Sequence, residues 1–262
     1  MITKQVSESF RITFENFLAE KDIKWCGNCF AGYKNGLFSY VNLFETHRKQ
    51  GEDIDIIYRI LPDFYVNKET ISRSNNCQYT FKMIANSVDK PIDCGIYDYE
   101  MFFKSCFDIL KSEYDRLFCY DSVTDYAQRM VLNCNLLIEY AGKHQEISNA
   151  YGEFANMDLT YLVYYYLKHQ SYDECSNLVM NLIGAYKILL YDKIKQGNLS
   201  ELKEKLSDFE QQKFENLFEN YGKLTHFAEA LLENNIRFFA QADNIYELKK
   251  LNGRKYIQNF LN

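Results

Sequence analysis

Three aspartates and a histidine are the densest group of potential acids, bases or metal ligands in the sequence. Asp115, Asp121 and Asp125 lie close together, and Glu139 and His144 follow. Carboxylates four residues apart share one face of a helix, where they can bind a divalent cation. The group therefore predicts a metal-dependent enzyme site. A structural interpretation is preferred, because Asp121 and Asp125 fall in the first turn of a predicted helix, where acids stabilise the helix dipole.

Cys26 and Cys29 form the only close cysteine pair among the eight cysteines. Such a pair can bind zinc or perform redox chemistry, but zinc requires two further ligands at suitable spacing. His47 supplies only a third ligand. We therefore expect no metal and no cofactor, and we interpret the pair as packing residues beside a glycine turn. Two alternatives stay open. One is zinc binding by Cys26, Cys29 and His47, and the other is redox activity of the thiol pair.

Four tyrosines occupy most of the circumference of a predicted helix at residues 159–168. Tyr161, Tyr164, Tyr165 and Lys168 point away from the apolar stripe that predicts the core side. An exposed aromatic face beside a positive charge is typical of protein-binding surfaces. These residues thus predict a partner site, unless neighbouring helices cover them, which is the preferred alternative.

The familiar catalytic and nucleotide-binding motifs are missing from the sequence. We find no nucleophile elbow, Walker loop or dinucleotide-binding glycine pattern. The net charge is −6, and it is concentrated in residues 98–158, where 5 basic and 11 acidic residues give 5 − 11 = −6. A nucleic-acid-binding protein usually carries a basic footprint. Only a modest basic content favours that class here, from Arg48, Lys49, Lys68, Arg73 and Lys82.

The chain contains only 2 prolines and 11 glycines, which predicts long helices with few connections. We therefore expect an all-α fold with an N-terminal helical region over residues 1–142 and a C-terminal array of antiparallel helical hairpins over residues 150–262. The boundary is predicted within residues 143–156, and the two regions can share one core. In the N-terminal region, Leu37, Tyr40, Val41 and Phe44 predict one helix face, and Cys77 to Val88 predict another.

Turns in the C-terminal region are predicted near Gln170–Ser171, Gly197–Asn198, Gly222 and Asp243–Asn244. One predicted hairpin resembles a tetratricopeptide repeat of about 34 residues. The resemblance is carried by Leu162, Tyr166, Tyr172, Cys175 and Val179, and it covers a single repeat. It implies a concave surface that binds peptides or proteins.

These observations predict a non-enzymatic protein-binding or regulatory protein, as a subunit of a larger assembly or alone, with a protein partner. The alternatives are a helical enzyme with a carboxylate and histidine site and, third, a nucleic-acid-associated protein. The polar start of the chain predicts no secretory leader, and its cysteines predict free thiols in the cytoplasm. No run approaches the roughly 20 apolar residues that span a bilayer, so we expect no membrane association. The oligomeric state is left open.

Overall fold

The computed structural model describes residues 2–48, 51–72, 79–82, 99–117, 119–129, 160–195 and 208–262. The chain forms two compact units. Unit 1 contains Met1–Val123 and Leu251–Asn262, and unit 2 contains Thr124–Lys250. The domain boundary predicted within residues 143–156 lies outside the described residues and stays a prediction.

Unit 1 is built around an antiparallel sheet, so the predicted all-α fold is wrong. The five strands lie in sequential order, and they are β1 (Lys24–Trp25), β2 (Cys29–Lys34), β3 (Leu37–Arg48), β4 (Gly51–Pro62) and β5 (Tyr79–Lys82). The residues predicted as one helix face, Leu37 to Phe44, belong to β3. Of the second predicted helix, Cys77 to Val88, the described part is β5. Phe38 and Tyr40 are buried on one face of β3 and Val41 on the other, and burial on both faces of a strand outweighs helical spacing.

Asn35 and Gly36 connect β2 to β3 and explain how a glycine-poor chain forms a sheet. Lys34 pairs with Leu37, which leaves a connection of only these two residues. Their φ angles are 53° and 81°, and positive φ at both positions is the requirement of the tightest hairpin turn. Such a hairpin needs one glycine and no proline. A low count of these residues therefore does not exclude a sheet.

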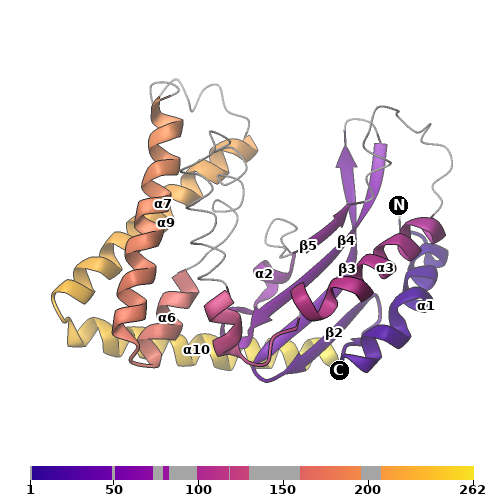
Figure 1. Cartoon of the computed structure of the whole chain (residues 1–262), viewed down its shortest axis with the longest axis horizontal. Coiled ribbons are helices and arrows are strands. Elements are labelled where there is room, and N and C mark those ends of the chain that lie inside the picture. The colour runs from indigo at the N-terminus through magenta and orange to yellow at the C-terminus, as the bar shows by residue number, and fades with distance from the viewer. Residues whose placement is uncertain are drawn as a thin grey trace. The chain divides into compact units, whose positions relative to one another are not determined.

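Helices α1 (Lys4–Glu20) and α3 (Tyr99–Leu117) cover one face of the sheet, and Figure 1 shows them side by side. The side chain of Thr3 caps α1 by accepting a hydrogen bond from the amide of Val6. The core side of α1 is aromatic, with the Phe10 ring 5.4 Å from that of Phe30 on β2. Burial of each such side chain contributes about 2 kcal/mol.

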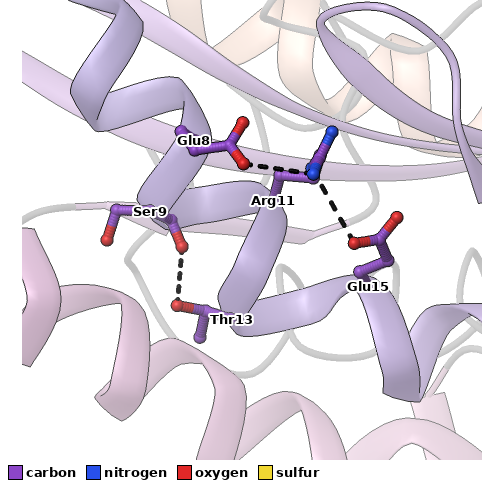
Figure 2. Close-up of polar contacts among 5 residues, drawn as sticks. All are labelled: Glu8, Ser9, Arg11, Thr13 and Glu15. Atoms are coloured by element: carbon purple, nitrogen blue, oxygen red, sulfur yellow. Dashed lines mark hydrogen bonds and ion pairs between the residues drawn. The ribbon is translucent and has the colours of Figure 1, made fainter.

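The opposite side of α1 carries short-range polar contacts (Figure 2). Arg11 lies between Glu8, at 3.1 Å, and Glu15, at 3.7 Å. The hydroxyl of Thr13 donates to the carbonyl of Ser9 at 2.8 Å. Exposed pairs three or four residues apart stabilise a helix by only about 0.2–0.5 kcal/mol each. The position of α1 is therefore determined by its buried aromatic residues.

The last turns of α10 (Ile236–Leu261) cover the other face of the sheet. The Phe260 ring lies 5.6 Å from both Phe38 and Tyr40 of β3. Nε of Arg254 donates to Oδ2 of Asp63 at 2.6 Å. Asp63 begins the short helix η1 (Asp63–Tyr65) directly after β4 and is buried. An ion pair and two aromatic contacts thus fasten residues near the C-terminus to this face.

Arg59 of β4 is fully buried between the sheet and the short helix α2 (Lys68–Ser72). Its Nη1 donates hydrogen bonds to the carbonyl oxygens of Thr70 and Ile71. The neighbouring residue Tyr58 points to the face that α1 and α3 cover, where its hydroxyl donates to that of Tyr114 at 3.3 Å. Both faces of β4 are therefore interior.

Unit 2 consists of helices in its described parts. They are the helical residues 124–129, α6 (Thr160–Lys168), α7 (Tyr172–Lys195), α9 (Asp208–Leu232) and the first part of α10. The turn predicted at Gln170–Ser171 is confirmed, because Gln170 has a φ of 55° between α6 and α7. The turns predicted at Gly222 and at Asp243–Asn244 are wrong, since these residues lie inside α9 and α10. The turn predicted at Gly197–Asn198 lies outside the described residues.

Each helix in the described ranges is too short or too polar to cross a membrane.

Substitution of Gly253 by alanine tests how closely α10 approaches the sheet. A Cβ at position 253 would overlap the carbonyl oxygen of Asp63, so the helix would have to move away from η1. We expect Gly253→Ala to lower the free energy of unfolding by about 2 kcal/mol or more. Urea unfolding followed by circular dichroism measures this loss.

Gly222→Ala is the matched control, because a Cβ at that position in α9 meets nothing within 4 Å. In a helix interior the same change is expected to raise stability by up to about 1 kcal/mol. If both substitutions changed the free energy of unfolding equally, the close approach of α10 to Asp63 would not restrict the side chain at residue 253.

Candidate functional site

The predicted acidic group is not assembled into one site in the described structure. Asp115 is exposed on α3 and pairs with Lys21 at 3.1 Å. Asp121 is exposed at the surface of unit 1, whereas Asp125 belongs to unit 2. His144 lies outside the described residues. Within the described ranges, no group of three His, Cys, Asp or Glu side chains is arranged to hold a metal ion.

Asp125 has a local role in its own helix. Its Oδ1 lies 3.2 Å from Nε of Arg129, four residues further along residues 123–129, which are helical. An acid near the start of a helix and a base one turn later is a stabilising arrangement. This pairing agrees with the structural interpretation of the aspartate.

Cys29 and His47 lie far apart along the sheet. Cys29 pairs with Asn42 across the β2–β3 ladder, and His47 lies five residues further along β3, roughly 17 Å away at the rise of a strand. Cys26 and Cys29 are free thiols. Burial raises the pKa of Cys29 to about 12, so this thiol is protonated and weakly nucleophilic at neutral pH. Positions 29 and 47 are therefore too far apart along the backbone to bind one zinc ion.

The predicted tyrosine surface is largely covered within unit 2. Tyr161 and Tyr165 are each only 4% exposed, and the hydroxyl of Tyr161 lies 3.1 Å from that of Tyr126. Tyr164 is half-buried, with its ring 5.3 Å from Phe227 of α9. Here the structure follows the alternative in which neighbouring helices cover the tyrosines.

Lys168, the predicted cation beside these tyrosines, is held by two carboxylates of α10. Its Nζ lies 2.6 Å from Asp243 and 2.9 Å from Glu247. These hydrogen bonds raise the pKa of the Lys168 ammonium group. The charge of Lys168 is balanced inside unit 2 and connects α6 to α10.

A pocket of about 220 Å³ lies in unit 1 beside the β2–β3 turn. Its walls include Lys34 and Asp22, which form an ion pair at 2.6 Å, and the tyrosine Tyr114. Burial raises the pKa of the Tyr114 hydroxyl. The pocket offers hydrogen-bonding and charged groups to a small polar molecule but no activated nucleophile among these three residues. Its residues come from distant parts of the sequence, so no local pattern predicts it.

The strongest candidate surface lies at the turn between α9 and α10. Leu232 and Ile236 flank this turn, and they are 86% and 80% exposed. Tyr172, at the start of α7, is also exposed, and its ring lies 5.4 Å from that of Phe239 on α10. We define these four residues, Tyr172, Leu232, Ile236 and Phe239, as the tip surface. Ile236 lies one helical turn before Phe239 on α10, and Leu232 precedes Ile236 by four residues across the turn.

Two asparagines determine the turn that exposes this surface. Asn234 ends α9 in a left-handed conformation, with a φ of 48°. Asn235 begins α10, because its side chain accepts a hydrogen bond from the amide of Phe238 at 3.1 Å. Asparagine is among the few residues favoured at both positions. This pair is the sequence signal that could have predicted the turn and therefore the tip surface.

Comparisons with known proteins do not identify a relative. No protein-family model matches the chain. No curated protein and no solved structure matches it.

The raised pKa values of the buried thiols imply that the free energy of unfolding depends on pH. Burial raises the pKa of Cys29, Cys106 and Cys175 from 9.0 to about 12 in each case. Between pH 9 and 12 the unfolded chain therefore binds fewer protons than the native protein, and the free energy of unfolding falls as pH rises. Each thiol contributes up to about 1.4 kcal/mol per pH unit. Urea unfolding at several pH values from 8 to 10 measures the slope.

Cys175→Ala separates the contribution of one thiol from that of the others. This variant is expected to show a flatter decline, by up to about one proton, between pH 9 and 10. A free energy of unfolding that stays constant from pH 8 to 10 would contradict the assignment of these thiols as buried and protonated.

Proposed function

We propose that this is a non-enzymatic protein-binding protein that contacts its partner through the tip surface. The carrying observation is the exposure of Leu232 and Ile236, at 86% and 80%. Burial of one such side chain contributes about 1.5–3 kcal/mol of favourable free energy. A side chain that stays exposed to water does not contribute it. Clustered exposed apolar residues are typical of protein interfaces, so a partner that covers the tip surface would recover it.

The chemistry of the described side chains supports binding over covalent catalysis. A nucleophilic cysteine needs a lowered pKa, which a nearby cation or a helix N-terminus provides. Burial instead raises the pKa of Cys29, Cys106 and Cys175. These thiols act as packing residues in the proposal. Free cysteines also support residence in a reducing compartment such as the cytoplasm.

The double variant Leu232→Ser and Ile236→Ser tests the proposal. Both side chains are exposed, so the change is expected to leave the fold and its stability within about 0.5 kcal/mol. Loss of two anchors at the centre of an interface costs at least about 2 kcal/mol of binding, or about 30-fold in affinity. We expect a stoichiometric partner, captured from the native host with the tagged wild-type protein and identified by mass spectrometry, to be lost with the variant.

Ile12→Ser is the matched control, since Ile12 is 65% exposed on α1 of unit 1. It removes an exposed isoleucine away from the tip surface, and the captured partner should be retained. A partner that binds the double variant as well as the wild type, as shown by equal recovery, would contradict a role for the tip surface.

A further inference from the structure

Acidic side chains border the tip surface and indicate the chemistry of its partner. Asp173 and Glu174 follow Tyr172 in the first turn of α7. Glu229 lies one helical turn before Leu232, and Glu233 follows Leu232 directly. All four carboxylate residues are exposed. Arg237 follows Ile236 directly, so acids outnumber bases four to one among these sequence neighbours of the tip surface.

Glu229 and Glu233 stand where an acid does not help the helix. They lie at the C-terminal end of α9, and the helix dipole disfavours negative charge there. The amide of Glu233 bonds to the carbonyl of Glu229, so the two side chains are one turn apart, a spacing at which like charges repel. His226 lies 4.0 Å from Glu229, with both side chains more than 70% exposed. Helix stability therefore does not account for these two carboxylates.

Asp173 and Glu174 have an ordinary structural explanation. Both lie in the first turn of α7, where the helix dipole favours acids. Their charges nevertheless lie beside Tyr172 at the edge of the tip surface. They have the same sign of charge as Glu229 and Glu233, and all four carboxylates would attract a basic partner most strongly at low salt.

We infer that the tip surface binds a basic amphipathic segment of a partner protein. This inference rests on the proposed function and adds the class of partner. Apolar side chains of the segment would cover Leu232, Ile236 and Tyr172. Its lysine or arginine side chains would pair with Glu229 and Glu233 and relieve their mutual repulsion. The apolar contacts provide affinity, and the charges provide selectivity.

The same charges argue against other occupants. A second copy of the chain bound through a two-fold axis would place the tip surface of one copy against that of the other. The acids would then face each other, which is unfavourable. Anionic lipid surfaces and nucleic acids carry the same sign of charge as this border and would be repelled. A basic protein segment satisfies both the apolar centre and the acidic edge.

Fluorescence anisotropy with a synthetic helical peptide tests the inference on the full chain. The probe is about 18 residues long, with leucine on one face and lysine on the other. We expect saturable binding that Glu229→Gln with Glu233→Gln weakens by about 5-fold. Leu232→Ser with Ile236→Ser should weaken it by about 30-fold. Affinity should also fall as salt is raised.

Two controls separate specific recognition from general attraction to an acidic protein. Glu8→Gln with Glu15→Gln removes two exposed carboxylates from α1, and it should leave peptide affinity unchanged. The same peptide with glutamate in place of every lysine should not bind. Circular dichroism establishes that each variant is folded.

Several outcomes would overturn the inference. They are equal affinity for wild type and Glu229→Gln with Glu233→Gln, preference for the glutamate peptide, or no binding of the lysine peptide. Self-association in sedimentation velocity that Leu232→Ser with Ile236→Ser abolishes would assign the tip surface to a second copy instead. If a native partner is still lost with that double variant, the proposed function stands and only the partner class fails. If no native partner depends on the tip surface, the proposed function fails.

Discussion

The constraint on which unit 1 depends is that both faces of strand β4 are interior. Tyr58 and Arg59 are neighbours in β4, point to opposite faces and are both fully buried. Each face therefore needs its own cover of helices. Helices α1 and α3 supply aromatic residues to the Tyr58 side, and α2 accepts the hydrogen bonds of Arg59. The last residues of α10 complete the second cover through Phe260 and Arg254.

The polar groups on the α10 side explain why this cover is specific. Asp63 is a buried carboxylate, and leaving such a charge without partners is costly. It accepts hydrogen bonds from Arg254 at 2.6 Å and from the hydroxyl of Tyr33 at 2.9 Å. The absence of a side chain at Gly253 allows α10 to approach the backbone of Asp63. Glycine, arginine and phenylalanine at three positions of one helix thus define where it rests on the sheet.

The helices were predictable from sequence to a much greater extent than the sheet. Phe10, Phe14 and Leu18 repeat with helical spacing, and they are buried on α1 as that spacing requires. The sheet was missed because Tyr40, Val41 and Phe44 also fit a helix face, and scarce glycine and proline favoured helices. Asn35–Gly36 between two apolar runs was the better signal, since this dipeptide strongly favours a two-residue hairpin.

The candidate surfaces show a similar limit. Burial of Tyr161 and Tyr165 depends on their neighbours in unit 2, which local spacing does not reveal. Leu232 and Ile236 have the residue types of a core, and only the turn at Asn234 and Asn235 places them in solvent. Since no turn was predicted there, the same sequence pattern indicated continued packing. A surface formed by helix ends is visible only when the ends themselves are correctly placed.

The division of α10 between the two units has a consequence for biosynthesis. Residues up to Lys250 belong to unit 2, and residues from Leu251 onward belong to unit 1. The first 123 residues of unit 1 therefore leave the ribosome well before residues 251–262. Those later residues complete the cover of the Arg59 face of the sheet. During that interval Phe38 and Tyr40 lack their contact with Phe260. The nascent chain must keep an apolar sheet face from aggregation until all of unit 2 has been translated.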